Sequence, residues 1–177
     1  SSDLTQATCR LFAFSPFRSI PGKEVPVSLS PQTDYLASDE LRLDWQNRLA
    51  SIEMKHLLSL LAFTVDGSQA CSLNVEAVPT EATYDLTGGT LSVKQGNGTI
   101  SSGTNMLLLL PGRLENRKAQ IRYQDHSYDW YLPANTFEAG KRYDYALTLS
   151  KEGVLMLSGV SARPWETGGD YTGTIQP

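Results

Sequence analysis

Short stretches in which apolar and polar residues alternate dominate the sequence, and this period of two constrains the fold more than any other feature. Successive side chains of an extended strand point to opposite faces, so each such stretch can bury one face. The clearest examples are residues 25–29, 71–77, 119–123 and 143–149. Residues 106–110 are apolar at every position, which suits a strand buried on both faces.

Turn-forming residues separate these stretches at intervals of about 8–12 residues. Two hairpins stand out. One spans residues 119–132, with its turn at Gln124-Asp125-His126-Ser127, and the other spans 143–157, with its turn at Ser150-Lys151-Glu152-Gly153. Short strands at this spacing predict an all-β protein, either a sandwich or a barrel.

Residues 35–63 fit two patterns. A helix would place Leu49, Ile52, His56, Leu60 and Phe63 on one face. A strand also fits, because a β-bulge near Ser59-Leu60 would bring both sets of alternating apolar residues to one face. We expect a helical turn or loop around 39–49 and a bulged strand over 51–65.

Size, composition and charge narrow the class of protein. At 177 residues, with 40% hydrophobic and 19% charged residues, the chain can bury a core and is too apolar for intrinsic disorder. No apolar run approaches the ~20 residues needed to cross a bilayer. The net charge of −4 and the lack of a Lys/Arg cluster argue against nucleic acid as a partner.

The termini and cysteines add little about chemistry. The chain begins at Ser1 without Met or an apolar leader, which suggests a mature or trimmed chain, and Cys9 lacks the sequence context of a lipid-attachment cysteine. We expect Cys9 and Cys71 to be buried free thiols, although a disulfide would fit an oxidising compartment. The Gly-rich residues 167–173 predict an extended or mobile tail.

No constellation of catalytic residues emerges, so we expect no enzyme, no metal and no cofactor. His56 lies in an apolar stretch and is predicted to be a core histidine with a hydrogen-bond partner. His126 falls in a predicted turn beside Asp125. Residues 96–101 nearly match a Gly-rich phosphate loop, but Ser101 replaces the third glycine and no helix is predicted to follow.

Three aromatic residues on the first hairpin are the only candidates for ligand or partner contact. Tyr128, Trp130 and Tyr131 would stack on a sugar ring or a partner protein if they were exposed together. Alternation favours another arrangement, in which Tyr128 and Trp130 fill the core and Tyr131 faces outward.

The order of segments resembles the fimbrillin-like family of Gram-negative anaerobes. Residues 9–17 are similar to that family's aromatic strand with its Pro turn, residues 32–37 to its Gln-x-Asp-Leu-Leu element, and residues 52–65 to its His-containing strand. Residues 137–149 resemble its Phe-x-Ala-Gly-Lys-x-Tyr-x-Tyr strand, and Arg163-Pro164-Trp165 matches its closing Trp.

This resemblance implies an antiparallel β-sandwich of transthyretin-like, Greek-key type, preceded by a short β segment from a reduced or trimmed first domain. The expected division is 1–50 for the N-terminal β segment, 51–165 for the sandwich and 166–177 for the tail. It also implies export as a lipoprotein to the outer membrane or a fimbrium, and a role in adhesion or pilus assembly.

The same resemblance implies partners that are other fimbrial subunits or surface ligands, and membrane attachment only through a lipid anchor outside this chain. Subunits of the family polymerise by donating a strand to a neighbour, which is a form of β-augmentation. The short Gly-rich tail points to a tip, anchor or accessory subunit. The alternative hypothesis is a secreted carbohydrate-binding module that uses Tyr128, Trp130 and Tyr131.

Overall fold

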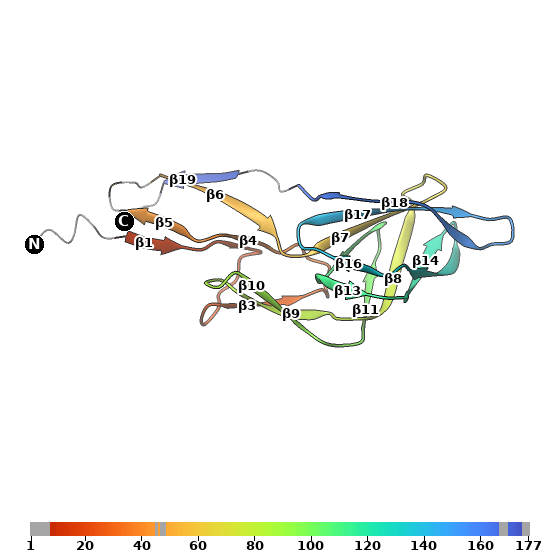
Figure 1. Ribbon diagram of the computed structural model, residues 1–177, viewed down its shortest axis with the longest axis horizontal. Coiled ribbons are helices and arrows are strands. Elements are labelled where there is room, and N and C mark those ends of the chain that lie inside the picture. Colours follow the sequence, from red (N-terminus) through yellow and green to blue (C-terminus); the bar gives the residue numbers. More distant parts are fainter. Residues whose placement is uncertain (1–7, 45, 47–48, 167–169, 175–177) are drawn as a thin grey trace, which may run out of the picture.

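The computed structural model describes residues 8–44, 46, 49–166 and 170–174. Every regular element within these ranges is a β-strand, which confirms the predicted all-β class. Across the same ranges, no helix is long and apolar enough to span a membrane. The described part of the molecule is elongated, and its first and last strands, β1 (Thr8–Leu11) and β19 (Asp170–Thr174), lie at one end of it (Figure 1).

Two four-stranded sheets form the larger body, at the end away from β1 and β19 (Figure 1). One has the order β12-β7-β17-β18, with bounds Met106–Leu109, Ser59–Val65, Lys141–Leu149 and Leu155–Pro164. The other has the order β11-β8-β14-β15, with bounds Gly98–Ser102, Cys71–Val78, Arg117–Tyr123 and His126–Leu132. All pairs in these sheets are antiparallel except β7 with β17, which run parallel.

Aromatic side chains join the inner faces of these two sheets. Phe63 on β7 stacks on Tyr145 of β17 with ring centroids 5.1 Å apart, and it meets the edge of Trp130 from β15 at 6.0 Å. Such offset and edge-to-face pairs add to the stabilisation from burial. The sheets therefore pack face to face as a sandwich.

Smaller sheets form the end that holds β1 and β19 (Figure 1). One has the order β19-β6-β4-β2, with bounds Asp170–Thr174, Leu49–His56, Leu36–Ser38 and Phe14–Ser15. A second has the order β10-β9-β3, with bounds Thr90–Lys94, Glu81–Asp85 and Glu24–Ser28. Two ribbons complete the fold: β1-β5 (Thr8–Leu11 and Leu41–Asp44) and β13-β16 (Gly112–Leu114 and Asn135–Phe137).

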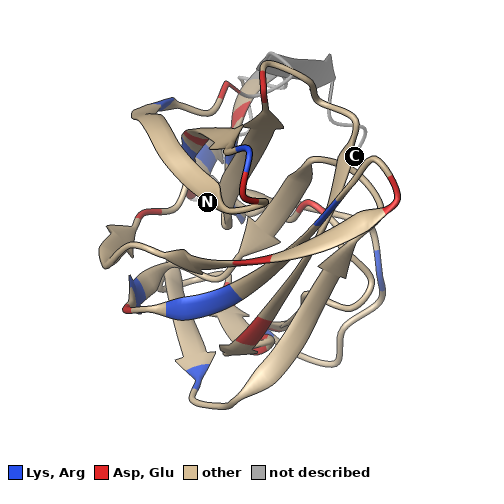
Figure 2. Ribbon diagram, turned by 90° about the vertical axis from the view of Figure 1, so that its right-hand side faces the viewer, with Lys and Arg blue, Asp and Glu red and all other residues tan. Residues whose placement is uncertain are grey.

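One contiguous cluster of buried apolar residues runs through both ends of the molecule. It includes Val27 of β3 and Tyr84 of β9 as well as Leu107 and Ile121 of the larger body. The division into 1–50, 51–165 and 166–177 stays a prediction, and strand β6 spans the first of its boundaries. Charged residues of both signs are interspersed over the strands (Figure 2).

The expectations for residues 39–65 were wrong in part. Residues 41–44 form strand β5 rather than a helical turn or loop, while 45, 47 and 48 lie outside the described residues. Residues 51–65 are not one bulged strand, because β6 and β7 belong to different sheets. The chain leaves one sheet for the other where Leu57 N–H donates to Tyr35 O at 2.8 Å and Gly140 N–H donates to Leu58 O at 3.0 Å.

Both predicted hairpins are confirmed. The turn of the first is tighter than expected, because only Gln124 and Asp125 form it, both with positive φ, while His126 already pairs with Tyr123. Cys9 and Cys71 are both free; Cys71 is buried as expected, but Cys9 is exposed because its strand β1 pairs only with β5.

Candidate functional site

Strand β18 is an open edge of the larger sandwich. It pairs with β17 on one side, and no described strand pairs with its other side. It spans ten residues, and β15, the last strand of the facing sheet, contacts it. An edge strand presents unpaired N–H and C=O groups, which makes it a template for pairing with another chain.

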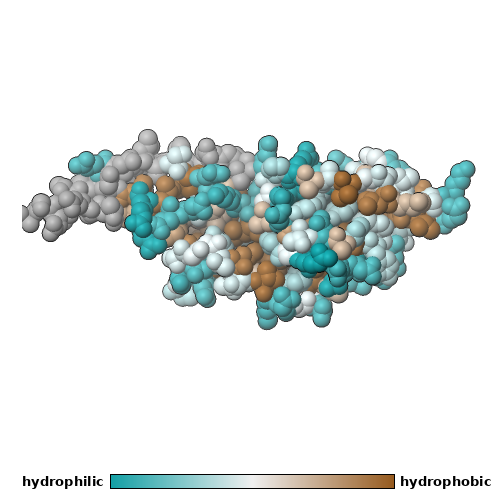
Figure 3. Space-filling view, in the orientation of Figure 1, coloured by the Kyte–Doolittle hydropathy of each residue, from teal (hydrophilic) through white to brown (hydrophobic). Residues whose placement is uncertain are grey.

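The inner face of the β17–β18 pair extends beyond the covered core. On β17, Tyr145 and Leu147 point inward and are buried. Their cross-strand partners Val160 and Leu157 share that face, yet they are 55% and 40% exposed. Hydrophobic residues accordingly gather on the surface over this part of the molecule (Figure 3).

A β-bulge in β18 places these two residues on the same face. The register shifts so that Ser158 and Gly159 together lie opposite Ala146, and the Ser158 hydroxyl donates to Ala146 O at 2.9 Å. The extra residue restores the inward direction of Val160. Simple alternation from Leu155 and Leu157 could not have identified Val160.

Strand β19 occupies the edge of a second sheet. It pairs antiparallel with β6 over five residue pairs, from Asp170 opposite Glu53 to Thr174 opposite Leu49. Part of the predicted extended tail is therefore a strand added to the sheet formed by the N-terminal part of the chain.

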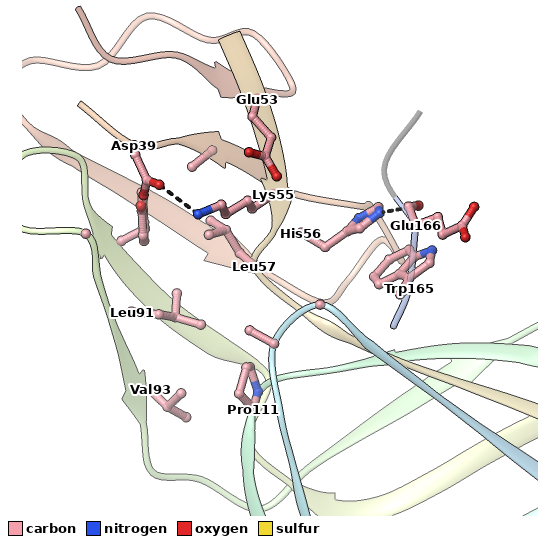
Figure 4. A pocket seen from close by; sticks show the side chains of 15 residues that line it. Asp39, Glu53, Lys55, His56, Leu57, Leu91, Val93, Pro111, Trp165 and Glu166 are labelled. Atoms are coloured by element: carbon pink, nitrogen blue, oxygen red, sulfur yellow. Dashed lines mark hydrogen bonds and ion pairs between the residues drawn. The ribbon is translucent and has the colours of Figure 1, made fainter. Parts of the chain in front are cut away.

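A histidine contacts the two residues Trp165 and Glu166, which precede this strand in the chain. His56 is 7% exposed, its Nδ1 lies 2.9 Å from the Asp34 carboxylate, and its Nε2 lies 3.0 Å from the backbone oxygen of Glu166 (Figure 4). The indole of Trp165 stacks on the imidazole, with centroids 3.5 Å apart and planes 8° apart. The backbone N–H of Trp165 also donates to the backbone oxygen of Gly140 at 2.8 Å. We call His56, Asp34, Trp165 and Glu166 the clasp. It confirms the predicted core histidine with a hydrogen-bond partner.

Comparison with known proteins gives the family. Residues 4–165 match the family model for fimbrillin-like proteins. The chain belongs to the fimbrillin-like family. No curated protein sequence matches it.

Solved structures share this fimbrillin-like fold. A candidate cell adhesion protein from Bacteroides uniformis is 20% identical, with a TM-score of 0.73 over 89% of this chain and 72% of that one. A second, from Bacteroides ovatus, is 17% identical, with a TM-score of 0.70 over 92% of this chain and 69% of that one. At these identities the likeness extends to the fold alone.

The predicted contact residues are not brought together on one surface of this fimbrillin-like protein. Trp130 is buried and makes edge contacts with Phe63 and Tyr145, and Tyr128 is half-buried against the core. Tyr131 is 53% exposed, and alternation along β15 directs it to the opposite face. A partner contact by these three residues stays a prediction.

Metal-binding chemistry finds no support in the described part of this fimbrillin-like chain. Within residues 8–44, 46, 49–166 and 170–174, no group of three His, Cys, Asp or Glu side chains is placed to hold a metal ion. The features that distinguish the molecule are instead an open strand edge, a docked C-terminal strand and the clasp at its base.

Proposed function

We propose that this protein is a non-catalytic cell-surface subunit, a tip, anchor or accessory component of a fimbrium, that assembles by β-strand exchange. Family membership supports a fimbrial or adhesive role. The proposal includes export as a lipoprotein to the outer membrane or fimbrium, and other fimbrial subunits or surface ligands as partners.

The observation that carries the proposal is the pairing of β19 with β6. A terminal strand that completes a sheet of its own chain can form the same backbone hydrogen bonds with the same sheet of a neighbour. In the sequence, three residues separate Glu166 of the clasp from β19. In exchange, β19 leaves its own β6 and enters that of a neighbour.

The open edge of β18 offers a second position for an incoming strand. Its exposed inner side carries Leu157 and Val160, which an incoming strand with apolar residues at alternate positions would cover. Deletion of β19 distinguishes strand binding at the β6 edge from strand binding at the β18 edge, because it exposes the first and leaves the second unchanged.

The experiment compares the full chain with a chain ending at residue 166 by light scattering after size-exclusion chromatography. We expect oligomers of the full chain that grow with concentration, and a monomeric truncated chain. A synthetic peptide of residues 167–177 should bind the truncated chain at 1:1 stoichiometry, whereas a peptide of the same composition in scrambled order should not.

Circular dichroism establishes that the truncated chain is folded. Strand exchange by β19 is refuted if the full chain stays monomeric at all concentrations and the truncated chain does not bind the peptide. Oligomers that persist after truncation would instead assign assembly to the β18 edge, which the charged substitution Val160→Glu should then abolish.

A further inference from the structure

A cavity of about 840 Å³ lies between strand β6 and the β9–β10 hairpin (Figure 4). Gly140, Trp165 and Glu166 line one end of it. This volume falls in the range of about 300–1,000 Å³ that is typical of small-molecule sites. The cavity lies beside the β6–β19 pairing, because Glu53 takes part in that pairing and also lines the cavity. It uses the side chains of β6 rather than its backbone edge, so a ligand here would be a further function.

One wall of the cavity is charged. Lys55 pairs with Ala37 across β4 and β6, so both side chains lie on the sheet face that looks toward β9 and β10. Its ammonium group lies 2.7 Å from the Asp39 carboxylate, and this hydrogen bond raises the pKa of Lys55. Glu53, two residues earlier on the same face, adds a second carboxylate.

The opposite wall is apolar. Leu91 and Val93 alternate on the edge strand β10 and are half-buried, and Leu57 and Pro111 lie beside them (Figure 4). The two sheets therefore face each other here across an open space with apolar and charged sides, where a closed sandwich would have interlocked apolar side chains.

A tyrosine hydroxyl without a partner among the described residues also faces this space. Tyr84 of β9 lines the cavity and is only 6% exposed, yet none of the described residues forms a hydrogen bond with its hydroxyl. Burial raises the pKa of Tyr84, so the phenol is neutral and can both donate and accept. Gly89 also lines the cavity, and a Cβ added at this glycine would lie 3.9 Å from the Tyr84 hydroxyl. The Tyr84 ring is buried, whereas its hydroxyl is open to the cavity, so the hydroxyl can form a hydrogen bond with a ligand there.

We propose that the cavity binds a neutral saccharide. Sugar hydroxyls both donate and accept, which matches carboxylate acceptors on Asp39 and Glu53, the ammonium donor of Lys55 and the two-way hydroxyl of Tyr84. The C–H faces of a pyranose ring pack against Leu91 and its apolar neighbours. Carboxylates outnumber ammonium groups in this wall, so an acidic sugar is repelled.

The test uses the full ¹⁵N-labelled chain and records amide shifts with galactose, mannose, N-acetylglucosamine and lactose. The matched acidic probe is 3′-sialyllactose, which contains the lactose core. We expect saturable shifts at Lys55, Leu91 and Val93 with at least one neutral sugar. Sialyllactose should bind more weakly than lactose, or not at all.

Two variants assign the binding to the cavity. Tyr84→Phe removes only the hydroxyl and should weaken binding about three- to tenfold, the usual effect of one hydrogen bond. Thr148→Val, at an exposed position of β17, removes a hydroxyl that does not line the cavity and should leave affinity unchanged. The proposal is overturned if no neutral sugar produces saturable amide shifts, or if sialyllactose binds more tightly than lactose. It is also overturned if Tyr84→Phe binds the sugar with the affinity of the unmodified chain.

Discussion

Substitution of Trp165 by alanine should release strand β19 without unfolding the larger sandwich. Truncating a fully buried Trp costs about 3–5 kcal/mol, and Trp165 is partly exposed, so about 2 kcal/mol is a reasonable loss. About 0.5–1.5 kcal/mol of this is the stacking on His56. Because about 1.4 kcal/mol corresponds to a factor of ten, the population with β19 undocked should rise about 30-fold.

Hydrogen–deuterium exchange measures this population directly. Backbone amides in the hydrogen bonds between β19 and β6 should exchange about 30-fold faster in Trp165→Ala if local undocking controls their exchange. Amides of β7 and β17, which pair at the centre of the larger sheet, should keep their protection. Trp165→Phe retains a ring against His56 and should give an intermediate rate.

Two results would refute this reasoning. Unchanged exchange of the β19 amides would mean that the clasp does not hold the strand. An equal acceleration in β7 and β17 would mean that Trp165 stabilises the whole fold rather than the C-terminal segment. Tyr131→Ala, which removes an exposed aromatic ring from β15, is the matched control and should alter neither set of amides.

Three further variants test the packing and electrostatics. Phe63→Ala empties a fully buried site and should cost about 3–5 kcal/mol in urea unfolding, whereas Val154→Ala on the exposed turn should cost under about 0.5 kcal/mol. Gly98→Ala places a Cβ 2.5 Å from Thr80 Cγ2 and should lower the free energy of unfolding by about 1–3 kcal/mol. Thr80→Ser removes that methyl group and should restore stability in the double variant. If it does not, the clash is not the cause of the loss. Hydrogen bonds from Gly88 N–H and Thr87 lower the pKa of Asp85 from 3.8 to about 2, so its stabilising contribution is complete above pH 3.8 and is lost as the pH falls toward 2. The Tm difference between the unmodified chain and Asp85→Asn should shrink over that interval, and a difference that is constant with pH would contradict the assignment.

Local signals explain which parts of the fold could be predicted. The hairpin of β14 and β15 was predicted because clean alternation brackets turn-forming residues, and both signals lie within a few residues of each other. Strand β19 was missed because Gly-rich sequence carries no alternation, and its extended form depends on pairing with β6, more than a hundred positions earlier. The end of β6 was missed for the same reason, since Leu57 bonds to Tyr35 and Leu58 to Gly140.

The candidate sites depend even more on long-range pairing, and Lys55 shows why. Alternation correctly assigns Met54 and His56 to a buried face, and it then directs Lys55 to the opposite face, as if to solvent. The β9–β10 hairpin lies opposite that second face, so the half-exposed Lys55 side chain lines a cavity between two sheets and contacts Asp39. No pattern within β6 encodes this arrangement, because it comes from residues about thirty positions later. A polar side chain of a strand can therefore be exposed to solvent and still line a cavity, as Lys55 does opposite Tyr84 of the facing strand.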